Sequence, residues 1–483
     1  MVRLRRSVRR TALVGVLATA AVLLPSVQVG AAVPGPKIVG AAATAVTVAG
    51  APSSITATLT YASTCSVSAS PAALVGNGAL PCSGSLSRAV WFPYNSTNQK
   101  ITYAVTVEVK GSGGTKLVTK NVKVSPGAGG GPRHIVAGGW TNGGRSCAVD
   151  SGTGLRCWGM LNPTTAVANL TGVVQVDAGY SYGNYADLCA LKSAGTVMCM
   201  GDNTHGQLGD GTWNPSGTPV AVTGLSGVTS ISVGPAHACG VLGSGGVRCW
   251  GSDAWGELGD GSTYPWSAGG RNAPVTVQGI TDAVAVAAGD GFTCALHSGG
   301  AVSCWGMGIH GELGDGLDAN NSWNNMSLSP KAVASVSGAV AIAAGHREAC
   351  AILRSGPVLC WGENADHDPN KSGGVDPSPY EVPGVAAAVA VSIGYSHACM
   401  AQGNGTVQCR GDNSVGQQGR TINEGPGPVV GLTDAVDIDA GDNHTCARRA
   451  TGAYVCWGDQ RFGQLGNSVY TGFAAHPVSV LGM

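Results

Sequence analysis

The chain has 483 residues, of which 11% are charged, 5% are aromatic and 77 are glycine. Charge this sparse excludes a long solvated coiled coil, and a hydrophobic content of 43% argues against general disorder. Glycine is abundant but lacks the every-third-residue spacing of collagen, which leaves a turn-rich β protein.

The first 32 residues predict a secretory signal peptide. A basic start precedes an apolar run of 14 residues, Thr11 to Leu24, and small residues follow at Gly30 and Ala32. A transmembrane anchor is the alternative, but a bilayer span needs about 20 apolar residues. The basic residues are Arg3, Arg5, Arg6, Arg9 and Arg10, whose pairs also fit twin-arginine export loosely.

Without this leader, 22 Lys and Arg face 27 Asp and Glu, so the mature chain carries a charge of about −5. Nucleic acid binding needs a basic stripe that displaces counterions, and a weakly acidic chain does not offer one. No other long apolar stretch follows the leader. We therefore expect a secreted, extracellular protein, free or associated with a cell surface, whose mature part does not insert into a membrane.

Residues 33–125 predict a small β-sandwich, immunoglobulin-like or related. Period-two alternation appears at 44–48, 55–61, 65–68, 101–109 and 117–124, with polar turns between. Cys65 and Cys82 are the two cysteines of this segment, and we expect a disulfide between them. Residues 126–133 predict a flexible Gly/Pro linker to the rest of the chain, residues 134–483.

The other 14 cysteines form seven pairs, each ten residues apart: Cys147 and Cys157, Cys189 and Cys199, Cys239 and Cys249, Cys294 and Cys304, Cys350 and Cys360, Cys399 and Cys409, and Cys446 and Cys456. Successive pairs begin 42 to 56 residues apart, which indicates a repeat architecture. A tight turn at a central glycine would set the two cysteines of a pair opposite each other in a hairpin, at a Cα separation of about 4.5–5.5 Å that a disulfide can span.

Zinc is the alternative ligand for paired cysteines, but zinc pairs are usually two to four residues apart. An exported chain also lies where thiols oxidise. We therefore predict disulfides in all pairs, with no metal and no cofactor.

Each repeat contains four short strand patterns. In the fourth copy they are 274–278, 283–287, 292–296 and 301–305. A four-stranded sheet repeated around an axis is a propeller blade, and seven hairpins with seven Pro-led strands predict seven blades. The last Pro-led strand, at Pro477, has no hairpin after it, and the first hairpin has no Pro-led strand before it. We therefore predict that Val478 to Leu481 pairs with the segment around Ile135 and Val136, and closes the ring through a shared blade.

Three motifs recur in phase over residues 134–483: A-G-x-x-H-[ST]-C-A-L, G-x-V-x-C-W-G and G-[QE]-L-G. This run resembles the regulator of chromosome condensation family of seven-bladed propellers, and its cysteine pairs resemble the crinkly-like repeats of plant receptor kinases and of secreted bacterial members. Trp of the second motif is replaced by Met200 and Arg410, and the third motif is missing in the first blade and at residues 363–374. The resemblance implies partners rather than substrates, and the family's nuclear exchange role does not suit a chain with a signal peptide.

The histidines of the first motif, His237, His397 and His444, are interpreted as repeat scaffolding bonded to a neighbouring turn, with metal ligation across the axis as the alternative. Asp210, Asp260 and Asp315 follow the third motif but lack the alternating oxygens of a calcium loop, so we interpret them as turn residues. No local motif of a hydrolase, nucleotide-binding loop or zinc protease is present. We therefore expect no enzyme.

The loops that differ between repeats are the candidate binding sites, because variable loops on a rigid scaffold tend to carry function. The turns after the repeated Ala-Gly should share one face, and aromatic and Arg side chains are the usual anchors of protein interfaces. The candidates are Trp140, Tyr182, Phe292, Arg347 and Tyr395, with Trp323 on an inserted loop. Ordinary turn packing is the alternative interpretation.

These observations predict a secreted binding module that presents loop faces to a protein or glycan partner. Two alternatives stay open: a polysaccharide lyase or hydrolase with a site in the central pocket, and a cell-surface structural or adhesive protein with the sandwich as a stalk. Polar residues that converge on the axis would favour the enzyme, whereas a lining of Gly, Ala and Val would disfavour it.

Overall fold

The computed structural model divides the chain into two compact units, residues 1–129 and 130–483. In the first unit it describes the backbone of the strands between residues 37 and 124. In the second it describes residues 135–483 except 139–143, 151–152, 160–161, 180–186, 265–268, 318–324, 364–373, 386, 423 and 425–426, and the side chains of 162–163. The predicted leader, the linker and the Cys65–Cys82 disulfide lie outside the described part.

The first unit contains two antiparallel sheets. One has the order β1 (Lys37–Ala43), β2 (Ser53–Thr60), β5 (Gly84–Trp91), β4 (Leu74–Val75). The other has the order β3 (Thr64–Ser70), β6 (Ile101–Gly111), β7 (Gly114–Val124). Its immunoglobulin-like fold stays a prediction.

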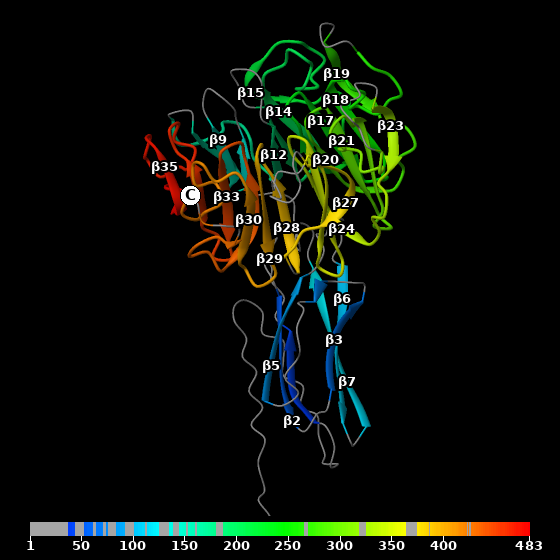
Figure 1. Ribbon diagram of the computed structural model, residues 1–483, viewed down its shortest axis with the longest axis vertical. Coiled ribbons are helices and arrows are strands. Elements are labelled where there is room, and N and C mark those ends of the chain that lie inside the picture. Colours follow the sequence, from blue (N-terminus) through cyan, green and yellow to red (C-terminus); the bar gives the residue numbers. More distant parts are fainter. Residues whose placement is uncertain are drawn as a thin grey trace, which may run out of the picture. The chain divides into compact units, whose positions relative to one another are not determined.

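The second unit is a seven-bladed β-propeller, as predicted, and every blade is a four-stranded antiparallel sheet (Figure 1). Blade 1 consists of β8 (Ile135–Gly138), β9 (Arg145–Val149), β10 (Leu155–Gly159) and β11 (Asn162–Ala166), and blade 2 of β12 (Val173–Ala178), β13 (Leu188–Lys192), β14 (Val197–Gly201) and β15 (Ser216–Ala221). Blade 3 consists of β16 (Val228–Val233), β17 (His237–Leu242), β18 (Val247–Ser252) and β19 (Gly270–Thr276). Blade 4 consists of β20 (Ala283–Ala288), β21 (Phe292–His297), β22 (Val302–Met307) and β23 (Met326–Ala332).

Blade 5 consists of β24 (Ala339–Ala344), β25 (Glu348–Leu353), β26 (Val358–Glu363) and β27 (Val375–Glu381). Blade 6 consists of β28 (Ala388–Ile393), β29 (His397–Gln402), β30 (Val407–Gly411) and β31 (Gly427–Pro428). Blade 7 consists of β32 (Ala435–Ala440), β33 (His444–Arg449), β34 (Tyr454–Asp459) and β35 (Phe473–Ser479). The described residues contain no helix that is long and apolar enough to cross a membrane.

The seven repeated cysteine pairs form disulfides between the second and third strands of each blade. The two cysteines of a pair are direct cross-strand partners, as Cys147 and Cys157 are, and their Cα atoms lie 4.0–4.1 Å apart. The predicted pairing is therefore confirmed for these seven pairs. All 14 cysteines are buried, so the disulfides hold the middle of each blade.

The predicted closure through a shared blade is wrong. Strand β35 pairs with β34, where Val478 opposes Cys456, and β8 pairs within its own blade with β9. Each Pro-led strand is thus the outermost strand of the blade that it follows, not the first strand of the next. The physical reason is that proline lacks an amide hydrogen and is tolerated on an edge strand, where no further strand needs that donor.

Packing between blades closes the ring instead. Strand β8 lies against β32 and β33 of the last blade, and Ile135 and Trp158 share a buried cluster with Cys456, Leu465 and Val480. Figure 1 shows β9 of the first blade beside β33 and β35 of the last. The other buried clusters likewise join residues of neighbouring blades, so the hydrophobic core of the propeller lies between its blades.

Candidate functional site

Two sets of turns meet at one end of the propeller, which we call the loop face. Because successive strands of a blade are antiparallel, the turn after the first strand and the loop after the third strand leave the blade at the same end. The first set contains the repeated Ala-Gly turns, and the second contains the Gly-Gln/Glu-Leu-Gly loops. The cysteine hairpin turns lie at the opposite end.

The repeated histidines hold neighbouring blades together. The Nε2 atom of His397 lies 2.8 Å from the Thr445 hydroxyl, which donates to the Gln417 carbonyl. The same arrangement joins His237 to Thr293 and His444 to Ser146. Since each hydroxyl gives its hydrogen to a carbonyl, the histidine Nε2–H must be the donor, as it is in a neutral ring whose hydrogen is on Nε2.

Burial supports this neutral form, because it lowers the pKa of His237 and His397 to about 3 and that of His444 to about 4. The interpretation of these histidines as scaffolding is confirmed for their hydrogen bonds. They are not available for acid–base chemistry at neutral pH.

The tryptophans of the second motif act in the same way. The indole N–H of Trp250 donates to the Gln207 carbonyl in the preceding blade at 2.9 Å. Four more indoles make the equivalent bond: those of Trp158, Trp305, Trp361 and Trp457. One carbonyl in each Gly-Gln/Glu-Leu-Gly loop therefore receives the tryptophan, and in three blades also the hydroxyl, of the next blade.

A ring of seven glycines surrounds the axis at the loop face. They are Gly138, Gly179, Gly234, Gly289, Gly345, Gly394 and Gly441, one at the end of each innermost strand. A Cβ on Gly234 would lie 2.7 Å from the Gly289 carbonyl oxygen, and one on Gly441 would lie 2.9 Å from that of Ala137, so the backbones touch all the way round. The described turns after these glycines, in blades 3 to 7, consequently lie side by side on one face.

Polar side chains on the innermost strands also bond between blades. Asp439 accepts hydrogen bonds from the Ala137 amide at 2.7 Å and the Ser392 hydroxyl at 2.8 Å. Asp177 accepts them from the Val233 amide and the Ser232 hydroxyl. These bonds hold the two carboxylates within the scaffold. The matching strands of blades 4 and 5, β20 and β24, read AVAVAA and AVAIAA and contain no polar side chain.

The turns of blades 4, 5 and 6 bring together a polar group on the loop face, which we call the rim cluster. His346 Nε2 lies 3.4 Å from Asp290 Oδ2, and its ring stacks on Tyr395 with centroids 4.1 Å apart. Arg347 donates to Glu363 Oε2 at 2.9 Å. His310 and Glu312 complete the cluster from the third loop of blade 4, with His310 Nδ1 3.9 Å from the same Glu363 oxygen.

Burial sets the charges within the rim cluster. It lowers the pKa of His346 to about 4, helped by Arg347, and raises that of Glu312 to about 8. Burial also opposes the charge of Arg347, but its hydrogen bond to Glu363 outweighs that effect and raises its pKa. At neutral pH, Arg347 is therefore the charged donor of the cluster, next to a neutral histidine and a protonated Glu312.

Two of the predicted binding residues, Arg347 and Tyr395, lie in the rim cluster, and Tyr395 is 38% exposed. Phe292 is a correction, because its side chain is 0% exposed and its ring lies directly beneath Gly289. The glycine lacks a side chain at that point, so the aromatic ring fills the space and cannot contact a partner. Trp140, Tyr182 and Trp323 lie outside the described residues.

Sequence reasoning missed Asp290, His310 and Glu363. They belong to three separate turns that become neighbours across the boundary between blades, so local sequence carries no signal for their contact. It also missed Trp213, which is 45% exposed on the third loop of blade 2. An aromatic residue two positions after the Leu-Gly-Asp-Gly run is the available signal for Trp213.

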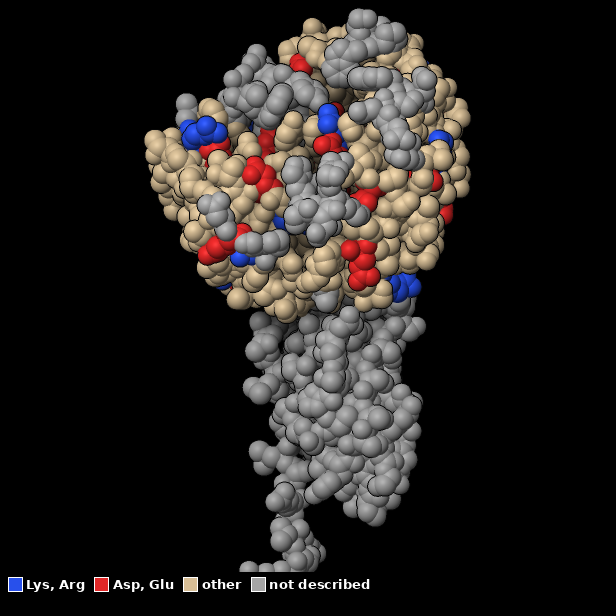
Figure 2. Space-filling view, viewed as in Figure 1, with Lys and Arg blue, Asp and Glu red and all other residues tan. Residues whose placement is uncertain are grey.

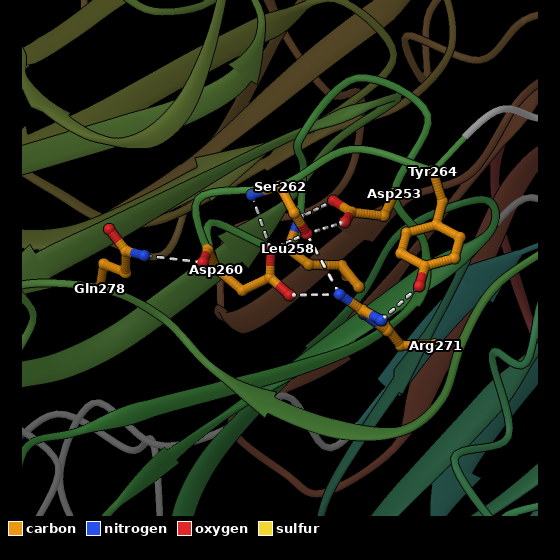
Figure 3. Close-up of polar contacts among 7 residues, drawn as sticks. All are labelled: Asp253, Leu258, Asp260, Ser262, Tyr264, Arg271 and Gln278. Atoms are coloured by element: carbon orange, nitrogen blue, oxygen red, sulfur yellow. Dashed lines mark hydrogen bonds and ion pairs between the residues drawn. The ribbon is translucent and has the colours of Figure 1, made fainter.

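The third loop of blade 3 forms a second polar group, shown in Figure 3. Arg271 reaches from β19 to Asp260 Oδ2 at 3.1 Å and donates to the Tyr264 hydroxyl at 2.9 Å, with its guanidinium 4.3 Å from the ring centre. These contacts tie the described ends of the predicted insertion, Tyr264 and residues 269–272, to the blade. Burial, with Glu257 and Asp260 nearby, raises the pKa of Asp253 in this group to about 8.

Among the described residues, one group brings three potential metal ligands together, and it consists of Glu348, Cys350 and Cys360. The two sulfurs are bonded to each other, and Glu348 forms an ion pair with Arg410. This donor set does not fit a metal ion. The described part of the loop face presents hydrogen-bonding groups, ion pairs and exposed rings.

Comparison with protein families identifies the repeats. Models of the regulator of chromosome condensation (RCC1) repeat match residues 173–207, 283–312, 388–417 and 435–464, and a second model matches 194–241 and 244–296. The chain therefore contains RCC1 repeats, as the resemblance of its motifs implied. The comparison with curated proteins gives no match.

Solved structures share the fold. Yeast RCC1 (Prp20) in complex with Kap60 is 17% identical at a TM-score of 0.54, over 64% of this chain and 74% of that one. Prp20p from Saccharomyces cerevisiae, reported with its binding properties to Gsp1p and histones, is 18% identical at 0.53, over 63% and 76%. Human WBSCR16 is 21% identical at 0.57, over 66% and 84%. At these identities the likeness concerns the propeller fold alone.

Proposed function

We propose that this chain is an exported binding module whose loop face recognises a protein. The observation that carries the proposal is the exposed part of the rim cluster: the Arg347–Glu363 ion pair, with 36% and 45% of its side chains exposed, beside Tyr395 stacked on His346. Protein interfaces concentrate their binding energy on a few aromatic and Arg side chains. Here three neighbouring blades present such side chains together.

The scaffold supports this role because it holds the turns in place before binding. Disulfides fix the second and third strands of each blade, and indole and histidine hydrogen bonds fix blade to blade. A preorganised surface loses less conformational entropy on binding. Rigid turns with variable side chains are what a recognition surface needs.

Export is consistent with the same function. Disulfides form and persist in oxidising compartments, and the N-terminal sequence predicts a leader. We further propose that residues 33–125 form an immunoglobulin-like sandwich that acts as a spacer. The partners named for the yeast structures, Kap60, Gsp1p and histones, are proteins, which supports a protein over a glycan partner.

A polysaccharide-acting enzyme is the weaker candidate. Its site would need free polar groups on the axis, but Asp177, Ser232, Ser392 and Asp439 are engaged with neighbouring blades. The rim cluster, in contrast, carries exposed groups.

Affinity capture tests the proposal. The purified mature protein is immobilised, a partner is captured from the native medium, and its dissociation constant is measured for Arg347→Ala and Tyr395→Ala. Truncation of an interface anchor costs about 2 kcal/mol or more, so we expect affinity to fall more than tenfold in both.

Matched controls lie away from the loop face. Arg449→Ala removes an Arg that is 37% exposed and bonded to one carboxylate, like Arg347, but next to a hairpin turn. Val284→Ala removes part of an exposed apolar side chain at the start of an innermost strand, at the end opposite the loop face. If Arg347→Ala and Tyr395→Ala bind as tightly as the parent, recognition lies elsewhere and the proposal is wrong.

A further inference from the structure

The propeller is strongly acidic, which the balanced charge of the whole chain conceals. Residues 134–483 contain 26 Asp and Glu against 14 Lys and Arg, a net charge of −12. On the face shown in Figure 2, acidic side chains are spread over the propeller among fewer basic ones. A partner that binds this unit meets a negative field, which favours a basic surface.

One carboxylate on the loop face has no partner. Asp442 is 3% exposed, and neither of its side-chain oxygens makes a hydrogen bond. Buried polar groups are almost always bonded, because an unsatisfied one costs its full desolvation energy. The scaffold therefore does not account for Asp442, whereas Asp177 and Asp439 are both bonded across blades.

Asp442 occupies the same register position as the rim cluster. It directly follows the ring glycine Gly441, as Asp290, His346 and Tyr395 follow theirs in blades 4, 5 and 6. The contacts of His346 with Asp290 and with Tyr395 show that side chains at this position meet across blade boundaries. The repeat therefore places Asp442 one blade further round the axis than Tyr395. Asp290, His346, Tyr395 and Asp442 thus form a row over blades 4 to 7.

We infer that this row of residues binds a Lys or Arg side chain of the protein partner, with Asp442 and Asp290 as counter-charges and the Tyr395 ring as the stacking surface. The inference rests on the proposed function and names the chemistry of its partner. A cation next to a desolvated carboxylate and an aromatic face gains both charge-assisted hydrogen bonds and cation–π attraction.

Neighbouring groups fit a basic side chain better than an anion or a metal. Arg347, the cation of the rim cluster, is already bonded to Glu363. His346 adds no positive charge above about pH 4. Within the described part of the chain, no set of three metal-ligand atoms includes Asp442 or Asp290.

Binding of a cation should displace a proton. Burial raises the pKa of Asp442 to about 8, so the free protein holds this carboxyl mostly protonated at pH 7. A bound ammonium or guanidinium favours the ionised form. We therefore expect the affinity for a basic ligand to rise between pH 6 and pH 9, while His346 stays neutral throughout.

Titration calorimetry with octalysine as the probe, and octaglutamate as its opposite, tests the inference on the mature protein. We expect octalysine to bind with release of up to one proton at pH 7, seen as a dependence of the heat on the buffer. Asp442→Asn and Tyr395→Ala should each weaken binding about tenfold, and Asp442→Asn should abolish the proton release. Asn has the shape of Asp and needs no ionised form, so this variant should fold.

The control is Asp282→Asn, which makes the same substitution next to β20, at the end opposite the loop face. If this variant lowers the affinity for octalysine as much as Asp442→Asn does, octalysine binds through the overall negative charge of the propeller and the inference is wrong. Absence of octalysine binding to the parent also overturns it. If Asp442→Asn binds octalysine fully while Arg347→Ala still loses the captured partner, this inference fails and the proposed function stands.

Discussion

Arg410 donates a hydrogen bond to Glu348 at 2.5 Å across the boundary between blades 5 and 6, and both side chains are buried. Each residue replaces a repeat residue: Glu348 stands where three other blades have histidine, and Arg410 where five other blades have tryptophan. The Gly-Gln/Glu-Leu-Gly loop that would accept the indole is missing from blade 5. The ion pair therefore substitutes for a lost inter-blade contact, with the Tyr380 hydroxyl as a further partner of Arg410.

Removal of one partner of this pair should destabilise the propeller strongly. Arg410→Met leaves Glu348 as a buried carboxylate without its counter-charge, which typically costs about 3–5 kcal/mol. The double variant Glu348→Gln with Arg410→Met leaves no charge behind and should lose less than the single variant. Urea unfolding at pH 7 measures both, and equal losses would show that the charge of Glu348 is not what the arginine balances.

The histidine bonds predict a second, smaller effect. Thr445→Val keeps the shape of the side chain but removes the hydroxyl that accepts from His397 and donates to Gln417. The buried imidazole N–H then lacks an acceptor, which costs about 1–3 kcal/mol. Thr164→Val removes an exposed hydroxyl bond to Leu481 and serves as the control. We expect the midpoint of urea unfolding to fall for Thr445→Val and to stay within error for Thr164→Val.

The sequence contains a signal for these inter-blade contacts, but the signal lies in pairs of successive repeats and not in a single motif. A histidine at 237, 397 or 444 is followed in the next blade by Thr293, Thr445 or Ser146, whereas the four blades without histidine are followed by Ala or Leu. Met200 and Arg410 likewise come after the two blades that lack any Gly-Gln/Glu-x-Gly loop, whereas blade 6 keeps one at residues 416–419 and is followed by Trp457. Comparison of each repeat with its successor, rather than with a consensus, would have predicted these contacts.

Other features could not be predicted in this way. Alternation identified the strands, but it does not tell whether a Pro-led strand pairs with the strand before it or after it, so β35 was assigned to the wrong blade. The position of Phe292 resembles that of surface turn residues, yet its ring fills the space under Gly289. The rim cluster depends on the spacing of blades 4, 5 and 6 around the axis, which no local pattern encodes.

Asp253 should make the stability of the propeller depend on pH. An unfolded Asp titrates near 3.8, and burial raises the pKa of Asp253 in the folded state to about 8. Between these values the folded state binds more protons than the unfolded one, so the free energy of unfolding falls as the pH rises. Blades 2 and 6 have Asn203 and Asn413 here, whose amides donate to the carbonyls of Thr212 and Thr421.

Asp253→Asn should therefore stabilise the protein, and its advantage over the parent should grow from pH 5 to pH 8. Urea unfolding at both values measures this difference. Asp260→Asn is the control, because it weakens the ion pair with Arg271 (Figure 3) and should not stabilise. An advantage for Asp253→Asn that is the same at both pH values would mean that this carboxyl does not titrate in that range.

The glycine ring makes the last prediction. A Cβ on Gly394 would clash with the Gly441 carbonyl oxygen, which belongs to the backbone of the next blade and cannot rotate away. Insertion of a methyl group into such close packing typically costs about 1–3 kcal/mol, and here it must also spread two blades. We expect Gly394→Ala to lower the thermal midpoint by several degrees and to weaken partner binding, since Tyr395 follows directly. Gly299→Ala is the matched control, because a Cβ there meets nothing within 4 Å. Equal midpoints for the two variants would show that the ring tolerates side chains and that the blades do not depend on backbone contact at the axis.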